Sequence, residues 1–374
     1  MKHEQGRRNF LWTLGSAATA SLLWAKDSRA AFPFLGLGSA QPAKLTNAES
    51  RSGANFVSVQ APGVPTIQGT LNGNVREFQL TAQQLTVQFP DMSDGMGMRG
   101  RSINVWGYNG SMIGPTLEAV EGETVRVLFT NNLPEPTTVH FHGIELPIEM
   151  DGVPGFSQEA VPPGGSFVYE FPLNQSGTYF YHSHYMPAKQ VGLGMMGFFV
   201  IHPKNPAPSQ LVDHDYAYFL HTWKINPGSS IPNTLEMSDF NYFTMNGRVG
   251  NGVKGWQLPP MKARVGERVR IRVTNLSMLT HPVHLHGHTF RITDWGGGFL
   301  PESQQIKANT INVSSAEVRV LEFIARAPGK WMFHCHFTHH TMNDMDRPPL
   351  PGTPPMEGMH DMDMGGMSTW IEIT

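Results

Sequence analysis

The sequence predicts an all-β protein made of two similar Greek-key sandwich or barrel domains. Short segments alternate between apolar and polar residues, as half-buried strands do, and almost none has helical periodicity. The 39 glycines and 29 prolines supply the frequent turns that such folds need. At 374 residues the chain is long enough for two domains that each bury a core.

An internal repeat indicates that the two domains are copies of one unit. The segments Val120–Asn132 and Val265–Ser277 each place an alternating strand after a glycine turn. In both halves a histidine follows the turn glycine after 18 positions, giving the pairs Gly122 with His140 and Gly266 with His284. A second spacing is also shared, between Phe171, Gly177 and His182 and between Phe323, Gly329 and His334.

The repeat and the composition divide the chain into four regions. Arg7 and Arg8 precede a short apolar stretch and then small residues, which predicts a twin-arginine export signal over residues 1–30 and a periplasmic protein. The alternative, a membrane anchor, needs a longer apolar stretch. We expect a flexible linker over 31–55, a first domain over 56–205 and a second over 206–374, joined near the proline-rich His202–Gln210.

The composition points to metal chemistry and away from nucleic acids. The net charge is -3 and only 15% of residues are charged, so no basic surface for nucleic acid is expected. The 17 histidines and 21 methionines accompany a single cysteine, which cannot form a disulfide within the chain. Imidazole, thioether and thiolate groups are ligands of soft and borderline metals.

Four short segments contain most of the candidate ligands. They are His140–Gly143 (HFHG), His182–His184 (HSH), His281–His288 (HPVHLHGH) and His334–Met345 (HCHFTHHTMNDM). Residues i and i+2 of a strand point to the same face about 7 Å apart, so each His-x-His pair offers two imidazoles to one side. Two pairs from each domain make eight imidazoles, enough for a metal cluster at a domain junction.

The same alternation turns the cysteine toward a second site. Cys335 lies between His334 and His336 and faces away from them. Its thiolate can therefore bind a metal at a second site while the backbone still connects it to the two cluster histidines. His281 lies three positions before His284, so the two side chains face opposite sides of the strand. His340 and Met345 follow shortly after the cysteine. Two imidazoles, a thiolate and a distant thioether are the ligands of a blue copper site.

The first domain serves as an internal control. It keeps all four cluster histidines but none of the blue copper ligands. His281, Cys335, His340 and Met345 correspond there to Thr137, Ser183, Ala188 and Leu193. General histidine enrichment does not predict this contrast.

These segments and spacings resemble the four copper-binding signatures of the multicopper oxidases, a family that includes laccases and cuprous oxidases. The resemblance implies two cupredoxin-like domains, as in the small bacterial laccases, with four coppers per functional unit and electrons passing from a reductant to dioxygen through Cys335, His334 and His336. It implies a type 1 copper held by His281, Cys335, His340 and Met345. It assigns the type 2 copper to His140 and His284, and the type 3 pair to His142, His182, His184, His286, His334 and His336. It also suggests a homotrimer. Asp151 lies where family members often have an acid near the cluster, and the alternative is that this aspartate only forms a turn, because turns favour aspartate before glycine.

Several alternatives remain open at this stage. A copper nitrite reductase also has two such domains but needs fewer histidines, and a copper-sequestering protein needs no electron path through a cysteine. The methionine-rich segments Asp91–Gly100 and Pro348–Met367 suggest Cu(I) handling and copper tolerance, or are low-complexity sequence without a ligand. The reductant can be a phenol, Cu(I), Fe(II) or Mn(II). We expect the remaining histidines to be surface or satisfied core residues: His3, His202, His214, His221 and His288. His339 is the less well spaced alternative to His340.

Overall fold

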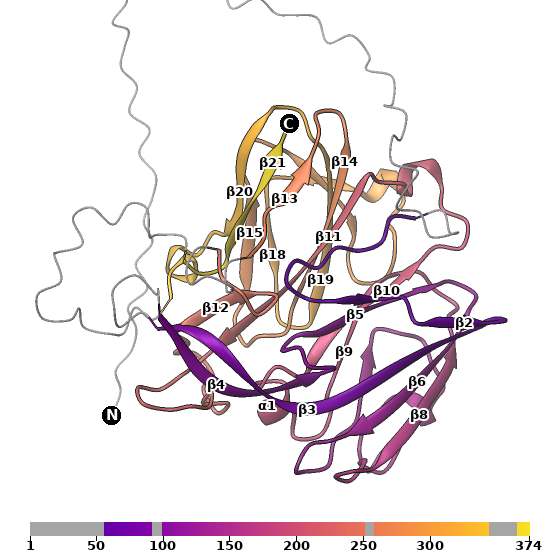
Figure 1. The fold of residues 1–374 in the computed structure, drawn as a ribbon. Helices are drawn as coiled ribbons and strands as arrows, with labels where there is room; N and C mark the ends of the chain where they lie inside the picture. Colours follow the sequence, from indigo (N-terminus) through magenta and orange to yellow (C-terminus); the bar gives the residue numbers. More distant parts are fainter. Residues whose placement is uncertain (1–55, 92–98, 251–257, 344–364) are drawn as a thin grey trace, which may run out of the picture. The chain divides into compact units, whose positions relative to one another are not determined.

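The computed structural model describes residues 56–91, 99–250, 258–343 and 365–374. These residues form an almost entirely β structure, which confirms the predicted fold class (Figure 1). The expected signal over 1–30 and the expected linker over 31–55 lie outside the described residues, as does Met345. The one α-helix of the described residues is the single turn α1 (Pro187–Gln190).

The first half of the chain forms two sheets. One sheet has the strand order β1 (Thr66–Ile67), β5 (Gly114–Val120), β10 (Met196–His202), β9 (Gly177–His182), β7 (His140–His142). The other has the order β2 (Thr70–Asn72), β3 (Val75–Asp91), β6 (Thr124–Asn131), β8 (Ser166–Pro172), with β4 (Arg99–Tyr108) paired to β3. The 3-10 turn η2 (Ile148–Met150) follows β7.

The second half also forms two sheets. One has the order β12 (Tyr242–Met245), β11 (His214–Trp223), β14 (Arg268–Asn275), β19 (Glu317–Ile324), β16 (Phe290–Asp294), β17 (Ile306–Ala308). The other has the order β13 (Met261–Ala263), β21 (Ser368–Ile373), β20 (Gly329–Cys335), β15 (His281–Leu285), β18 (Thr310–Val313). Short 3-10 turns connect the strands at η3 (Pro208–Gln210), η4 (Glu302–Gln304) and η5 (Thr338–Thr341).

The strand pairing reproduces the repeat read from the sequence. In the first half β6 pairs in parallel with β3 and antiparallel with β8, and in the second half β14 does the same with β11 and β19. Gly122 and Gly266 both have positive φ, 87° and 94°, which is why glycine occupies each turn. The strands that follow these turns, β6 and β14, therefore occupy equivalent positions in their sheets.

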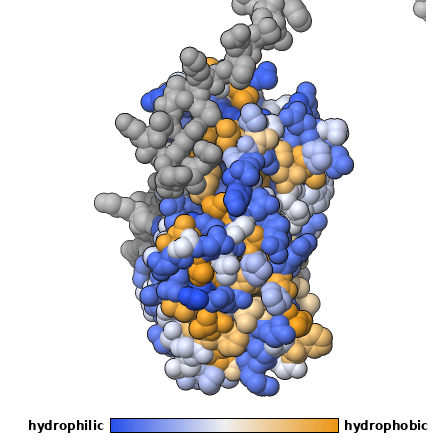
Figure 2. All heavy atoms as spheres, turned by 90° about the vertical axis from the view of Figure 1, so that its right-hand side faces the viewer, coloured by the Kyte–Doolittle hydropathy of each residue, from blue (hydrophilic) through white to orange (hydrophobic). Residues whose placement is uncertain are grey.

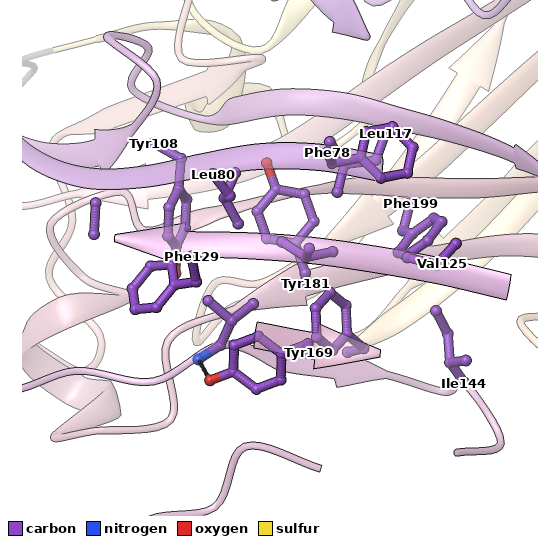
Figure 3. Packing of buried hydrophobic residues seen from close by; sticks show 14 of the residues in the cluster. Phe78, Leu80, Tyr108, Leu117, Val125, Phe129, Ile144, Tyr169, Tyr181 and Phe199 are labelled. Carbon is purple, nitrogen blue, oxygen red and sulfur yellow. Dashed lines mark hydrogen bonds between the residues drawn. The ribbon is translucent and has the colours of Figure 1, made fainter. Parts of the chain in front are cut away.

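Each half buries its own aromatic and aliphatic core. In the first half, rings from facing strands pack together, and the Tyr169 hydroxyl accepts a hydrogen bond from the Val139 backbone N–H at 2.9 Å (Figure 3). This bond holds the backbone immediately before β7. A further apolar cluster joins the halves, with Phe180 and Phe198 of the first packed on Phe219 of the second. The halves thus share one buried interface within the chain.

A buried ion network crosses that interface. Arg272 binds Asp215 through two nitrogens, at 2.8 and 2.7 Å, and also donates to the Thr178 hydroxyl on β9. Arg270 lies between Asp215 and Glu322. Because each charge here is paired out of water, removing one partner leaves its neighbours uncompensated.

We expect Asp215→Asn to lower the free energy of unfolding by about 3 kcal/mol, because two buried guanidinium groups lose their carboxylate. Asp239→Asn is the matched control: its side chain is 68% exposed and pairs with Lys224 at 2.7 Å, so a change within about 0.5 kcal/mol is expected. The measurement is denaturant unfolding, with both curves fitted to the same dependence of the free energy of unfolding on denaturant concentration. Equal midpoints for the two variants would contradict a stabilising role for the network.

The face drawn in Figure 2 mixes hydrophilic residues with small apolar groups. Over the described residues we find no helix with the length and apolar character required to cross a membrane.

Candidate metal centres

Two histidines and the single cysteine meet in the core of the second half. The Nδ1 atoms of His281 and His340 are 3.0 Å apart, and the Cys335 Sγ lies 3.8 Å from the first and 3.4 Å from the second. His281 begins β15, Cys335 ends β20 and His340 lies in η5, so three separate elements supply the donor atoms. None of the three side chains is more than 1% exposed.

These donor atoms fit a copper ion. Burial lowers the pKa of His281 to about 3 and that of His340 to about 4, so both imidazoles are neutral near pH 7 and have a lone pair to offer. Burial raises the pKa of the Cys335 thiol to about 12, so metal binding must displace its proton. Two converging imidazole nitrogens and a sulfur, shielded from water, match a blue copper ligand set.

Neighbouring side chains orient the two imidazoles. The Ser277 hydroxyl contacts His281 Nε2 at 2.9 Å, and the His340 ring stacks on Phe243 with centroids 4.3 Å apart. His339 is exposed and points its ring edge-on to His340, so it does not replace His340 beside the cysteine. Such contacts around a site fix ligand orientation.

The four histidines of the first half gather at one end of its sheet. His140 pairs across the strands with His182. Five of the six ring pairs among His140, His142, His182 and His184 have centroids 5.2–6.2 Å apart. In β7 the intervening Phe141 is buried in the core, so both histidines face outward, as the alternation predicts.

The second half repeats this arrangement. His284 pairs with His334, the counterpart of the pair His140 and His182. The Nε2 atoms of His286 and His334 are 3.1 Å apart, and the rings of His284 and His336 have centroids 5.5 Å apart. Two equivalent half-sites of four imidazoles therefore exist in one chain.

Backbone carbonyls select the nitrogen that each histidine leaves free. The Nδ1 atoms of four of these rings lie 2.7–2.9 Å from a carbonyl oxygen: His140 from Asp151, His182 from Ser183, His284 from Asn309 and His334 from Cys335. A ring that donates from Nδ1 keeps the Nε2 lone pair for a metal. The Asp151 carboxylate is also near, with Oδ1 3.4 Å from His140 Nδ1.

Within the described part of the chain, no close ring contact joins the two half-sites. Every histidine–histidine ring contact among these eight residues joins rings of the same half.

The first half carries a polar plug where the second has its thiolate site. Thr137 and Ser183 lie side by side with their oxygens 3.2 Å apart, as expected for the counterparts of His281 and Cys335. Gln190 bonds to both hydroxyls, with its Oε1 2.7 Å from the Thr137 oxygen. The plug satisfies its polar atoms internally and offers no soft ligand. Sequence spacing located Thr137 and Ser183 but not Gln190.

Of the other histidines, His3 lies outside the described residues, three behave as expected and one does not. His202 bonds to Glu118 at 2.9 Å, His214 bonds to Glu267 at 2.7 Å, and His288 contacts backbone groups. His221 is buried, yet its Nε2 has no partner among the described residues, and it lines a cavity of about 370 Å³. No spacing or repeat in the sequence marked it.

The methionine-rich segments fall mostly on residues 92–98 and 344–364, outside the described residues. Met367 is fully buried, and its carbonyl accepts the Cys335 backbone N–H at 3.0 Å. The expectation that the tail as far as Met367 handles Cu(I) therefore does not apply to its last methionine, which is part of the core.

We expect the copper-free protein to lose stability as the pH falls from 6.5 to 4.5. Burial lowers the pKa values to about 3 for His182 and His281 and to about 4 for His142, His221 and His340. Below about pH 6.5 these histidines are protonated in the unfolded chain but stay neutral in the folded chain. Each of them therefore lowers the free energy of unfolding by up to about 1.4 kcal/mol per pH unit. Denaturant midpoints measured across this range test it, with copper-loaded protein as the control, since bound copper would hold four of these imidazoles: His142, His182, His281 and His340. A flat profile for the copper-free protein would contradict it.

Comparisons with known proteins agree with this geometry. The chain is 31% identical over 277 residues to Copper resistance protein A of Pseudomonas syringae pv. tomato, covering 72% of this chain and 42% of that protein. It is 28% identical over 284 residues to Laccase-2 of Cryptococcus neoformans var. grubii serotype A, covering 68% of this chain and 47% of that laccase. The chain thus spans less than half the length of these relatives.

The solved structure of Blue Copper Oxidase from Nitrosomonas europaea shares the expected cupredoxin-like fold. It superposes with a TM-score of 0.66 at 28% identity, covering 80% of this chain and 86% of that one. Two sequence profiles described as Multicopper oxidase match residues 93–206 and 225–348. The chain belongs to the multicopper oxidase family.

Proposed function

We propose that this protein couples one-electron oxidation of a small reductant to four-electron reduction of dioxygen to water. The bound coppers would supply the redox chemistry, one at the type 1 site and three in a cluster that binds dioxygen. The observation that carries the proposal is the convergence of His281, Cys335 and His340 beside one half of the histidine cluster. His140 and His284 would hold the type 2 copper, and His142, His182, His184, His286, His334 and His336 the type 3 pair. Met345 would add a thioether ligand.

The residues around Cys335 link the two sites directly. His334 and His336 are its covalent neighbours, and His334 Nδ1 also lies 2.8 Å from the Cys335 carbonyl oxygen. Cys335 is in the core while its neighbours face the half-site, so one short stretch of backbone connects them. These residues would form the electron path.

The separation of the half-sites supports a cyclic homo-oligomer. If the first half of one subunit faces the second half of the next, the contact is heterologous and closes into a ring, for which we propose three subunits. Each subunit junction would complete one cluster.

Asp151 is proposed to supply protons to dioxygen reduction. Its carboxylate lies beside His140 and is 30% exposed, so it can exchange protons with water. We expect Asp151→Asn to lower kcat by about tenfold with the blue absorption unchanged, because the amide keeps the turn and cannot carry a proton. Steady-state oxygen uptake measures this. An unchanged kcat would assign Asp151 to the turn alone.

For the reductant we propose Cu(I) or a phenol, with a role in copper tolerance. The relative named Copper resistance protein A and the methionine-rich segments favour copper, while the relative named Laccase-2 favours phenols. Thioethers are ligands that select Cu(I). We further propose export through the twin-arginine route to the periplasm, which lysine replacement of Arg7 and Arg8 tests by cell fractionation.

The decisive experiment is oxygen uptake by the copper-loaded protein with Cu(I) and, separately, with a phenol. A companion variant replaces Met356, Met359, Met362 and Met364 with leucine and leaves the buried Met367 in place. If Cu(I) drives oxygen uptake and the methionine variant shows less of it, the protein is a cuprous oxidase. If only the phenol drives oxygen uptake, it is a laccase. Copper binding without uptake would favour the sequestering function, and nitrite consumption would favour a nitrite reductase.

A further inference from the structure

The residues just before β21 bond through their backbone to the segments that carry the candidate type 1 ligands. The Met367 N–H donates to the His340 carbonyl oxygen at 2.9 Å, and the Met367 carbonyl oxygen accepts the Cys335 N–H at 3.0 Å. The preceding Gly366 N–H donates to the Thr341 carbonyl oxygen at 2.8 Å. Two adjacent residues therefore hold both the cysteine and one of the two histidines.

Gly366 lies so close to the histidine segment that a side chain has no room there. A Cβ atom at Gly366 would lie 2.5 Å from the His340 carbonyl oxygen and 2.8 Å from the Thr341 carbonyl carbon. Both are backbone atoms, so the backbone itself would have to move. Glycine is the residue that allows two backbones to approach this closely. The position of His340 thus depends on the absence of a side chain at Gly366.

Asn343 connects the same segment to the ring that covers His340. Its Oδ1 accepts the Phe243 N–H at 2.8 Å, and its Nδ2 donates to the Gly365 carbonyl oxygen at 2.9 Å. Asn343 is 5% exposed, so water competes little for either bond. The Phe243 ring stacks on His340, with an angle of 18° between the two planes. One amide therefore joins the backbone and the ring that contact this histidine.

We propose that Gly366 and Asn343 are positioning residues for the type 1 copper, within a clasp formed by Asn343 and Gly365–Met367. The clasp holds His340 by its backbone and its ring, and holds Cys335 by its N–H. Bonds of this kind fix the orientation of metal ligands, whereas Cu(II) with freely moving ligands favours a tetragonal arrangement. The inference rests on the proposed type 1 assignment and adds the residues that maintain its geometry.

The alternative is that these contacts only attach the C-terminal strand. The pairing of β21 with β20 begins at Ser368, opposite His334, and continues to Ile373 without Asn343, Gly365 or Gly366. A clasp that acts only on the strand would change the stability of the protein and leave the bound copper unaltered. The properties of the copper therefore distinguish the two roles.

Gly366→Ala is expected to weaken type 1 copper binding by about tenfold, because the new methyl group displaces the His340 backbone. The blue absorption, which reports this copper alone, is followed as the copper-loaded protein is equilibrated with a Cu(II) chelator. Electron paramagnetic resonance should show a larger copper hyperfine splitting, as expected for a more tetragonal site. Gly297→Ala is the matched control: no atom of the described residues lies within 4 Å of its new Cβ, so both readings should stay at the wild-type values.

Asn343→Ala tests the clasp without adding an atom. It removes both amide bonds, and we again expect copper binding about tenfold weaker and a larger hyperfine splitting. Asn131→Ala is its control in the first half, where a fully buried amide also bonds to backbone groups, those of Leu133 and Val161. Both variants should unfold at lower denaturant concentrations, but only Asn343→Ala should alter the copper.

The outcomes separate this inference from the proposed function. If either Gly366→Ala or Asn343→Ala folds and keeps the wild-type copper affinity and hyperfine splitting, the inference is overturned. The same follows if Asn131→Ala alters the copper as much as Asn343→Ala does. A protein whose copper responds to the variants as expected, but which takes up no oxygen with any reductant, keeps the clasp and overturns the oxidase function.

Discussion

The Cys335→Ser protein is expected to fold, to bind one copper fewer per chain, and to lose its blue absorption and all measurable oxygen uptake. Serine replaces the thiolate by a hydroxyl that stays protonated, so the two imidazoles at 3.0 Å lose the soft third ligand. The link to His334 and His336 is broken at the same atom. The measurements are metal content, the visible spectrum and oxygen uptake with Cu(I) and with a phenol.

Ser183→Ala provides the control for this experiment. Ser183 occupies the equivalent position of the first half, also between two cluster histidines and also fully buried. Removing its hydroxyl loosens the plug around Gln190 and costs about 1 kcal/mol of stability, but the copper content and blue absorption should not change. Residual uptake by Cys335→Ser near the wild-type rate would overturn the assigned electron path.

Two inactive variants are expected to restore each other when they assemble together. His142→Ala damages the half-site of the first half, and His286→Ala damages that of the second; each alone should give no uptake. In a ring where neighbouring subunits complete each cluster, equal co-expression leaves one junction in four with both halves intact, so about a quarter of wild-type activity should return. Differently tagged chains allow the mixed assemblies to be purified, and in a ring of three each of these has one intact junction, so about a third of wild-type activity is expected after purification.

This result depends on where the cluster closes. If one chain supplied all eight histidines, no chain in the mixture would be complete and the purified mixed assemblies would stay inactive. The exposure of His286 and the half-exposed position of His142 make loss of folding an improbable cause of inactivity, which far-ultraviolet circular dichroism of each variant checks.

Strand alternation explains why the clustering of these histidines and of the cysteine could be predicted from the sequence. The parity of His281 against His284 and of Cys335 against His334 determines the face of each side chain, and the pairing of Val283 with Cys335 then aligns the two strands. The equal distances from Gly122 and Gly266 predicted the repeat of pairing between His140 and His182 and between His284 and His334. Local periodicity was enough for these features.

Features made by loops from distant parts of the chain were beyond such reasoning. The partner of His221 is a carbonyl 55 positions away, and the cavity beside it combines α1 with two loops of the second half. Gln190 reaches Thr137 across 53 positions, and its role depends on where the single turn α1 ends. The burial of Met367 follows from the pairing of β21 with β20, which its methionine-rich surroundings do not indicate.

The polar plug of the first half has a consequence for electron counting. Dioxygen accepts electrons in a set of four, and an oxidase that stores the same number releases fully reduced product at every turnover. On the proposed four-copper assignment, a second thiolate centre in place of Thr137, Ser183 and Gln190 would raise the number of stored electrons above the four that one dioxygen accepts. If the protein holds the proposed four coppers, the three polar side chains bonded to one another in the first half would keep the number of stored electrons equal to the number that one dioxygen accepts.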